Sequence, residues 1–191
     1  MKLSKKYQIK IPKDIKVIYS NNKNFLTIIG PLHKKSLKIK LELKILKEEK
    51  LIYVTKTVCK NLTITNKKLI KSLQGTFCSL IKQAILESSV TLHQNLKLVG
   101  VGYKIIPIDI NNQKILQLKL GYSHIIFFKI NIKKIQVSCL KATNIFIFGN
   151  SYSYVNQIAA KIRAYKKPEP YKGKGILYKN EKINLKEGKK V

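Results

Sequence analysis

The sequence is poor in acidic residues, histidine, cysteine and arginine. Nine of its 191 residues are Asp or Glu, against 39 that are Lys or Arg, so the formal net charge at pH 7 is +30. A folded chain with so much positive charge repels itself, and we therefore expect a polyanion to neutralise it. Nucleic acid is the first candidate, an anionic membrane the second and an acidic protein the third.

The same scarcity argues against an enzyme. General acid–base catalysis needs a carboxylate or an imidazole held in a pocket, but most of the acids stand in turn-like segments or among lysines, and the three histidines are scattered. No GxSxG, HExxH or Cys–His signature occurs. GVG at 100–102 fails as a dinucleotide fingerprint because Ile105 replaces its third glycine, and GKG at 173–175 lacks the other P-loop residues. We expect no catalytic site, no metal, no cofactor and no small-molecule substrate.

Paired cysteines and long apolar runs are lacking as well. Cys59, Cys78 and Cys139 are an odd, scattered set, which indicates reduced, mostly buried thiols inside a cell. No apolar run approaches the roughly 18 residues of a membrane span, so no membrane is expected as a partner. The first residues, MKLSKKYQIKIP, resemble neither a secretory signal nor a transit peptide. A protein of this kind that works in an organelle is expected to be made there.

Lysine dominates the cations, since Arg163 is the only arginine. Lysine, isoleucine and asparagine are the residues that AT-rich genomes over-use, which points to an organelle or a reduced bacterium. Lysine binds phosphate as a point charge and lacks the planar fork of arginine. Any nucleic acid is therefore expected to be recognised by its backbone and shape more than by its base edges.

The same succession, strand-like segments followed by a helical pattern, occurs twice along the chain. Alternating, strand-like segments precede a helical pattern that begins near Asn66, with Thr65 or Asn66 as its cap. Strand-like segments then return and precede a second helix at about 151–165. IIGPLHKK and KLGYSHII add a weak internal match, each with histidine three residues after glycine. Strands are expected at 16–20, 24–30, 37–43 and 50–55, and again at 96–105, 114–122, 125–131, 135–140 and 144–149.

This repetition predicts an α+β protein of two tandem similar domains, each an antiparallel sheet packed by one helix. The first domain is expected at 1–92 and the second at 93–165, with the boundary near Leu92. Residues 166–191 have no sustained periodicity, are rich in lysine and contain Pro168 and Pro170. We interpret them as an extended basic C-terminal arm.

Three glycines inside predicted elements allow two interpretations each. Gly75 lies in the first helix, where it costs about 1 kcal/mol relative to alanine. It is either a tolerated defect or a point where another backbone or RNA approaches. Gly100 and Gly102 interrupt a strand, which indicates a bulge or close packing. Alternatively, a phosphate rests on their amides beside Lys97 and Lys104.

The stretch PEPYKGKG in the arm combines residues suited to a phosphate backbone. The two prolines favour extended geometry and are expected to hold the arm straight. Gly173 and Gly175 allow the backbone to lie against a bulky ligand. Tyr171 is suited to stacking, and Glu169 to a lysine or a ribose 2′-OH. The cations are Lys166, Lys167, Lys172 and Lys174. A flexible basic tail is the alternative, but such a tail would not need the prolines.

The segment QIAAKIRAYKKPEPYKGKGILY closely resembles the C-terminal signature of the ribosomal protein L6 family of the large subunit. LKLVGVGYK and LKLGYSH resemble strands of its second domain, and QGTFCSLIKQAI resembles its first-domain helix. The resemblance implies two α+β domains related by duplication, with a structural role. It implies binding to large-subunit rRNA, chiefly through the second domain and arm, near the stalk base, the sarcin–ricin loop and neighbouring ribosomal proteins.

The candidate rRNA-binding residues combine both lines of reasoning. Lys97 and Lys104 come from the charge pattern, and the family motif carries over onto the others. They are Lys97, Gly100, Gly102, Lys104, Arg163, Lys166, Lys167, Glu169, Tyr171, Lys172, Gly173, Lys174 and Gly175. We expect a mitochondrial ribosome, with a plastid or the bacterial cytoplasm as the alternative. The rival functions are a nucleic-acid-modifying enzyme and a basic protein of a membrane surface.

Overall fold

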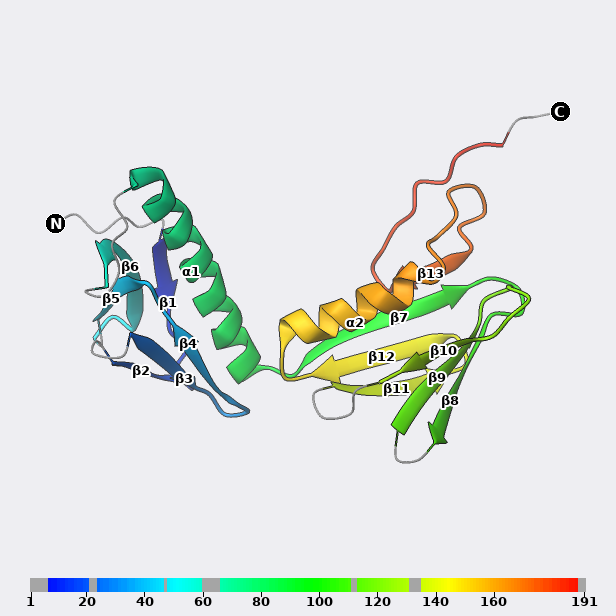
Figure 1. Ribbon diagram of the computed structural model, residues 1–191, viewed down its shortest axis with the longest axis horizontal. Helices are drawn as coiled ribbons and strands as arrows, with labels where there is room; N and C mark the ends of the chain where they lie inside the picture. The colour runs from blue at the N-terminus through cyan, green and yellow to red at the C-terminus, as the bar shows by residue number, and fades with distance from the viewer. Residues whose placement is uncertain are drawn as a thin grey trace. The chain divides into compact units, whose positions relative to one another are not determined.

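A computed structural model describes residues 7–20, 24–46, 48–59, 66–110, 113–130 and 135–188 of the chain. The chain divides into two compact units, Met1–Val90 and Thr91–Val191. In the described residues, α1 belongs to the first unit and α2 to the second, and Figure 1 shows each helix beside the strands of its own unit.

The described residues of the first unit form two three-stranded antiparallel sheets and one helix. One sheet has the strand order β1-β6-β5 and the other has the order β2-β3-β4. The elements are β1 (Gln8–Lys10), β2 (Lys16–Ser20), β3 (Phe25–Ile29), β4 (Lys34–Lys38), β5 (Leu41–Leu46), β6 (Leu51–Val58) and α1 (Lys67–Ser89).

The second unit contains a three-stranded and a four-stranded antiparallel sheet, also with one helix. The strand orders are β10-β9-β8 and β11-β12-β7-β13. The elements are β7 (Leu92–Val99), β8 (Lys104–Ile110), β9 (Gln113–Lys119), β10 (Ile126–Lys129), β11 (Ile135–Lys141), β12 (Asn144–Gly149), α2 (Tyr152–Ala164) and β13 (Gly175–Tyr178).

Both units follow the same topology, and the predicted α+β class with tandem similar units is confirmed. The meander β2-β3-β4 corresponds to β8-β9-β10, and the order β5-β6-β1 corresponds to β11-β12-β7. Each of these sets is followed by its helix in chain order. The two glycine–histidine segments occupy equivalent turns, Gly30–His33 between β3 and β4 and Gly121–His124 between β9 and β10. Among the strands of the described residues, β13 alone has no counterpart in the first unit.

The helices pack through the apolar faces that their periodicity predicts. Asn66 caps α1, since its side chain accepts a hydrogen bond from the Lys68 amide at 3.1 Å. The buried face of α1 contacts β1, β3, β4 and β6, while α2 contacts β7, β12 and β13. Burying one such side chain completely contributes about 1.5–3 kcal/mol. The buried apolar residues are Phe77, Cys78, Ile81, Ala84 and Ile85 in α1, and Val155, Ala159 and Ile162 in α2.

Two predicted strands are interrupted in the structure. The segment 37–43 spans the end of β4 and the start of β5, because the chain leaves one sheet at Ile39 and enters the other at Leu41. The segment 96–105 breaks into β7 and β8 at Gly100 and Gly102, whose φ angles are +154° and +73°. Positive φ is strained for most residues and favours glycine. These glycines therefore form a turn between two strands and not a bulge within one.

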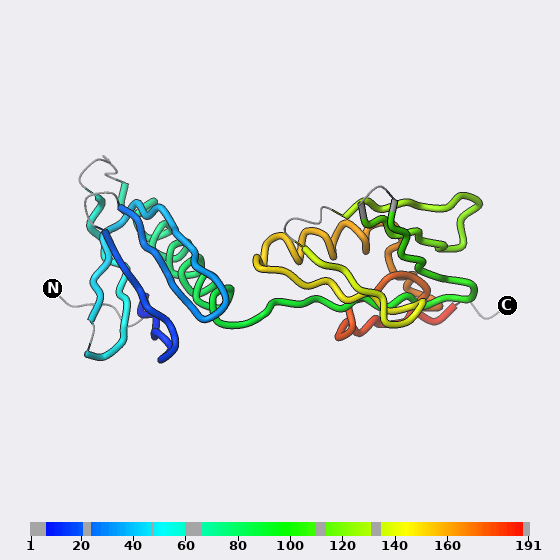
Figure 2. Tube along the Cα trace, turned by 90° about the horizontal axis from the view of Figure 1, so that it is seen from below, coloured from blue at the N-terminus to red at the C-terminus, as the bar shows by residue number. Residues whose placement is uncertain are grey.

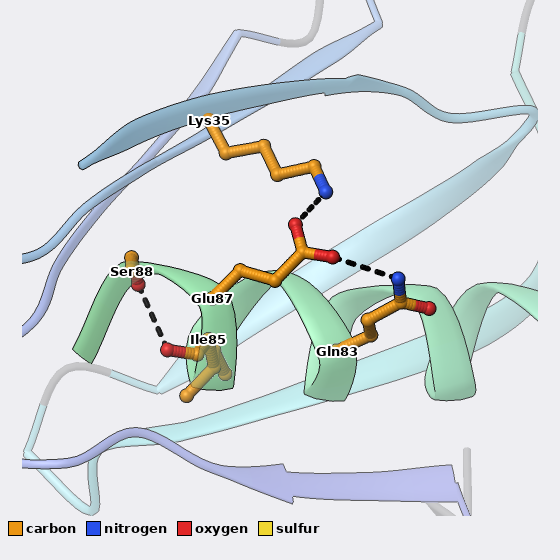
Figure 3. A network of polar contacts seen from close by, with 5 residues as sticks. All are labelled: Lys35, Gln83, Ile85, Glu87 and Ser88. Atoms are coloured by element: carbon orange, nitrogen blue, oxygen red, sulfur yellow. Dashed lines mark hydrogen bonds and ion pairs between the residues drawn. The ribbon is translucent and has the colours of Figure 1, made fainter. Parts of the chain in front are cut away.

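A buried polar cluster joins α1 to β4 in the first unit, as Figure 3 shows. The Glu87 side chain is only 2% exposed and accepts hydrogen bonds from Lys35 Nζ and, at 2.7 Å, from Gln83 Nε2. Burial lowers the pKa of the Lys35 ammonium. The cluster fixes the C-terminal part of α1 against the sheet.

Gly30 explains how closely α1 approaches the turn between β3 and β4. The Leu32 amide donates to the Ser88 carbonyl at 3.2 Å, next to this glycine. A Cβ atom at Gly30 would lie 2.3 Å from the same carbonyl oxygen, much closer than real Cβ contacts. The absence of a side chain at this position therefore permits the contact between helix and turn.

Candidate nucleic-acid interface

Part of the segment that we expected to be an extended arm forms the fourth strand of a sheet. Strand β13 pairs antiparallel with β7, and the register places Gly175 opposite Val99 and Tyr178 opposite Leu96. Ile176 is fully buried in the core of the second unit. Figures 1 and 2 show this segment in orange and red, after α2. The basic segment is therefore anchored to the unit by strand pairing.

The eight residues 168–175, which we call the proline-glycine loop, are closed by backbone hydrogen bonds. The Glu169 amide donates to the Lys174 carbonyl at 2.9 Å, and the Gly173 amide donates to the Glu169 carbonyl at 2.9 Å. Gly173 has a φ of +68°, in the left-handed region. The expectation that the prolines keep this stretch straight is therefore wrong, because these bonds fold it into a turn.

Close backbone packing holds the base of the proline-glycine loop. The Ile176 amide donates to the Lys166 carbonyl at 2.9 Å. Gly175 has a φ of +152°, and a Cβ atom there would lie 2.6 Å from the Pro168 Cα. The loop therefore needs glycine at this position for its own closure, before any ligand is considered.

The following residues cover one side of the proline-glycine loop. The Lys186 amide donates to the Pro170 carbonyl at 2.9 Å. A Cβ atom at Gly173 would lie 3.5 Å from Leu185 Cδ2, in ordinary van der Waals contact. Gly173 is buried, whereas Tyr171 is 54% exposed and Lys172 is exposed too. The tip of the loop thus presents an aromatic ring and an ammonium group to solvent.

The structure brings several predicted binding residues to one end of the four-stranded sheet. Because Gly175 pairs with Val99, the end of the proline-glycine loop lies next to the turn that contains Gly100 and Gly102. Lys104 begins β8 directly after this turn and is exposed.

Lys97 lies further along β7, opposite Leu177, and is exposed as well. Lys167 is exposed, Lys166 and Lys174 are half-buried, and Glu169 is exposed.

Arg163, another predicted contact, is bound to a partner within the unit. Its Nε donates to Glu181 Oε2 at 3.1 Å, Nη2 donates to Oε1, and the guanidinium lies 5.4 Å from the Tyr178 ring centroid. The hydrogen bond from Arg163 lowers the pKa of the Glu181 carboxyl, and the same bond raises the pKa of Arg163. Arg163 therefore holds the end of β13 against α2.

The sequence reasoning missed an aromatic cluster beside this interface. Lys166 Nζ lies 4.1 Å from the centroid of the Tyr122 ring, within the range of a cation–π contact. The Tyr122 hydroxyl donates to the Tyr165 carbonyl at 3.1 Å, and the Tyr122 and His124 rings stack with their centroids 5.6 Å apart. Both rings are exposed. The repeated glycine–histidine segment marked this turn, but nothing in its spacing indicated a contact with Tyr165 and Lys166, which directly follow α2.

The described residues offer little for other kinds of site. Among them, no three His, Cys, Asp or Glu side chains gather as metal ligands would. No helix in the described ranges has the length and apolar character of a membrane span. All three cysteines are free thiols, and Cys59 and Cys78 are buried.

Comparison with known proteins identifies the family. The model of the family described as ribosomal protein L6 matches residues 99–179. The large ribosomal subunit protein uL6 of Mycoplasma capricolum is 40% identical, over 95% of this chain and 93% of that protein. The uL6m protein of Reclinomonas americana is 39% identical over 96% of each chain. The uL6 protein of Persephonella marina is 36% identical, over 97% of this chain and 96% of that protein. The chain therefore belongs to the ribosomal protein L6 family, a family of structural proteins and not of enzymes.

Proposed function

We propose that this protein is a structural component of the large ribosomal subunit and binds large-subunit rRNA through its second unit. The observation that carries the proposal is the proline-glycine loop, which backbone bonds hold closed with Tyr171 and Lys172 exposed at its tip. A loop that is ordered before binding loses less conformational entropy when RNA is bound. The relatives named as large-subunit proteins and the net charge of +30 support the same function.

The chemistry of binding is electrostatic positioning on the phosphate backbone. Lys97, Lys104, Lys167, Lys172 and Lys174 supply point charges to phosphates. The turn at Gly100 and Gly102 brings the main chain close to the RNA. Tyr171 stacks on a base or ribose, and the exposed Glu169 accepts a hydrogen bond from a ribose 2′-OH.

Within this proposal, the other predicted residues support the binding surface. Arg163, Gly173 and Gly175 maintain the shape of the proline-glycine loop and its anchor, and Lys166 contributes charge beside Tyr122. We place the surface near the base of the stalk and the sarcin–ricin loop, next to neighbouring large-subunit proteins, as the family resemblance implies.

Charge reversal in the proline-glycine loop tests this proposal. Lys174→Glu is expected to weaken binding to a large-subunit rRNA fragment much more than Lys50→Glu, which changes an exposed residue in the turn between β5 and β6. For a footprint of six phosphates, the plot of log affinity against log salt is expected to have a slope of about −4 to −5. Equal effects of the two variants, or binding that salt does not weaken, would contradict the proposal.

We propose a mitochondrial ribosome as the location. The abundance of lysine, isoleucine and asparagine and the similarity to a uL6m protein support this choice. The similarity to bacterial proteins supports the bacterial cytoplasm as one alternative location. A plastid is the other alternative. Sucrose-gradient sedimentation of fractionated cells, with an antibody to this chain, is expected to find it with large subunits of the mitochondrial fraction. Its recovery with ribosomes of another compartment would refute this location.

A further inference from the structure

A hollow of about 280 Å³ lies on the four-stranded sheet of the second unit. Its lining residues come from three adjacent segments, β7, β12 and the turn after β13, and they are Asn95, Leu96, Lys97, Asn144, Phe146 and Lys179. Its volume is slightly below the range of about 300–1,000 Å³ that is typical of sites for drug-sized ligands. The hollow therefore suits one small group, such as a single base.

The register of the sheet shows which face carries the hollow. Phe146 pairs with Asn95, and Asn144 pairs with Lys97, so these four side chains share one face. The alternate residues, including Leu96 and Ile145, are buried in the core cluster that contains Ala159 of α2 and its neighbours. Successive side chains of a strand point to opposite faces. The hollow therefore opens on the face turned away from α2.

Two acceptors at this hollow have no hydrogen-bond partner among the described residues. They are Oδ1 of Asn95 and Oδ1 of Asn144, and neighbouring atoms shield both from solvent. Leaving a buried acceptor without a donor costs about 1–3 kcal/mol. The final torsion of an asparagine side chain is broad, so each amide can rotate at low energetic cost toward a donor in the hollow that it lines. A ligand with two suitably placed N–H donors would satisfy both.

The other lining residues define the rest of the ligand. Lys97 and Lys179 are exposed cations beside the hollow and suit an anionic group. The half-buried Phe146 ring suits a planar ring. A planar ring with N–H donors and an attached anion is a nucleotide whose base carries an exocyclic amino group. In a double helix this amino group is paired, so the base must be unpaired.

We propose that the hollow between β7 and β12 holds one unpaired, amino-bearing nucleobase of the bound RNA. The amino group donates to Asn95 and Asn144, the ring contacts Phe146, and the adjoining phosphates lie at Lys97 and Lys179. This inference rests on the proposed rRNA binding and adds a base-specific contact to an interface that otherwise follows the RNA backbone.

Oligocytidylate and oligouridylate provide a matched pair of probes. Cytosine and uracil stack similarly, but cytosine has an amino group with two N–H donors where uracil has a carbonyl oxygen, and uracil keeps one N–H donor at N3, so the pair differs by one donor to the two acceptors. Fluorescein-labelled (rC)6 and (rU)6 are titrated with the full chain at one salt concentration and followed by fluorescence anisotropy. The wild-type protein is expected to bind (rC)6 about tenfold more tightly, the effect of about one hydrogen bond to an otherwise unpaired buried acceptor.

Variants distinguish the contribution of the Asn95 and Asn144 side-chain amides from the general affinity of the protein for RNA. The double variant Asn95→Thr with Asn144→Thr removes both amides and keeps good strand formers. It is expected to bind (rC)6 as weakly as (rU)6. Gln136→Thr removes an exposed amide from β11, outside the hollow, and should keep the preference. Phe146→Leu should weaken binding of both oligonucleotides by about tenfold or more. Circular dichroism establishes that each variant is folded.

The outcomes distinguish this inference from the proposed function. Equal binding of (rC)6 and (rU)6 by the wild-type protein, or a preference that survives in the double variant, would overturn the base site. If salt-dependent binding to large-subunit rRNA persists in that case, the proposed function stands and the asparagines are satisfied by water. If wild-type protein binds no rRNA fragment, the proposed function itself fails.

Discussion

Arg163 of α2 and Glu181, eighteen residues further along the chain, form a two-point ion pair that spans β13. Both carboxylate oxygens accept from the guanidinium, and Oε2 also accepts from the Tyr178 amide at 3.1 Å. The two side chains are 28% and 23% exposed, so solvent screens the pair only in part. The only arginine of the chain thus adds a side-chain anchor to the strand pairing that holds the basic segment after α2.

Replacing Arg163 is expected to loosen this anchor. Arg163→Met should lower the free energy of unfolding of the second unit by about 1–3 kcal/mol, because it leaves a carboxylate without its main donor. Urea denaturation followed by circular dichroism measures this loss. Arg163→Lys should recover only part of the stability, since an ammonium cannot reproduce the two-point contact. Full recovery with lysine would show that charge alone is sufficient.

The lowered pKa of Glu181 predicts a dependence of stability on pH. A carboxyl whose pKa is lower in the folded state stabilises the fold above its unfolded pKa of about 4.3. This contribution is lost as the pH falls through the lowered folded value. The difference in unfolding free energy between the wild type and Glu181→Gln should therefore be constant from pH 7 to 5 and shrink toward pH 3. A difference independent of pH would mean that the carboxylate charge contributes nothing.

The buried pair in the first unit is expected to tolerate double replacement better than single replacement. Lys35→Met removes an ammonium that binds the buried Glu87 carboxylate and should destabilise the first unit by about 3–5 kcal/mol. Adding Glu87→Met removes the buried charge and should restore most of that loss. Thermal unfolding of the wild type, the single variants and the double variant gives the coupling energy. Additive losses would exclude direct coupling.

Gly75 offers a test of the two interpretations of a glycine inside a helix. A Cβ atom at this position would meet nothing within 4 Å, so no other described part of the chain requires the glycine. Gly75→Ala should stabilise the first unit by about 1 kcal/mol through helix propensity, as measured by chemical denaturation. Unchanged affinity for large-subunit rRNA would identify a tolerated defect, whereas a clear loss of affinity would place RNA against this face of α1.

Gly175 should tolerate no side chain. Gly175→Ala places a methyl group 2.6 Å from the Pro168 Cα, at a φ of +152°. The proline-glycine loop must then open or β13 must shift, and hydrogen exchange of the Ile176 amide should accelerate by at least tenfold. Gly188→Ala is a suitable control, because a Cβ atom there would meet nothing within 4 Å. Equal exchange in both variants would show that the loop does not depend on its close packing.

Long periodic segments were predictable from the sequence, and short ones were not. The cap at Asn66 and both helices follow from local pattern, since one face of each helix is apolar. Strand β13 escaped prediction because four residues between a glycine-rich turn and polar residues carry too little periodicity to identify a strand. The pairing of Arg163 with Glu181 was not predicted either, because strand β13 is what brings Glu181 close to α2. The hollow at Asn95 and Asn144 depends on strand register, which the sequence does not reveal.

The late position of β13 in the chain has a consequence for biosynthesis. The strands described in the first unit end at Val58 and its helix ends at Ser89, so this unit can fold while the rest is still being translated. The second unit must wait for residue 178, and until then the edge of β7 that β13 will cover is open. A nascent chain interrupted between α2 and β13 would therefore carry one finished unit and one aggregation-prone sheet edge.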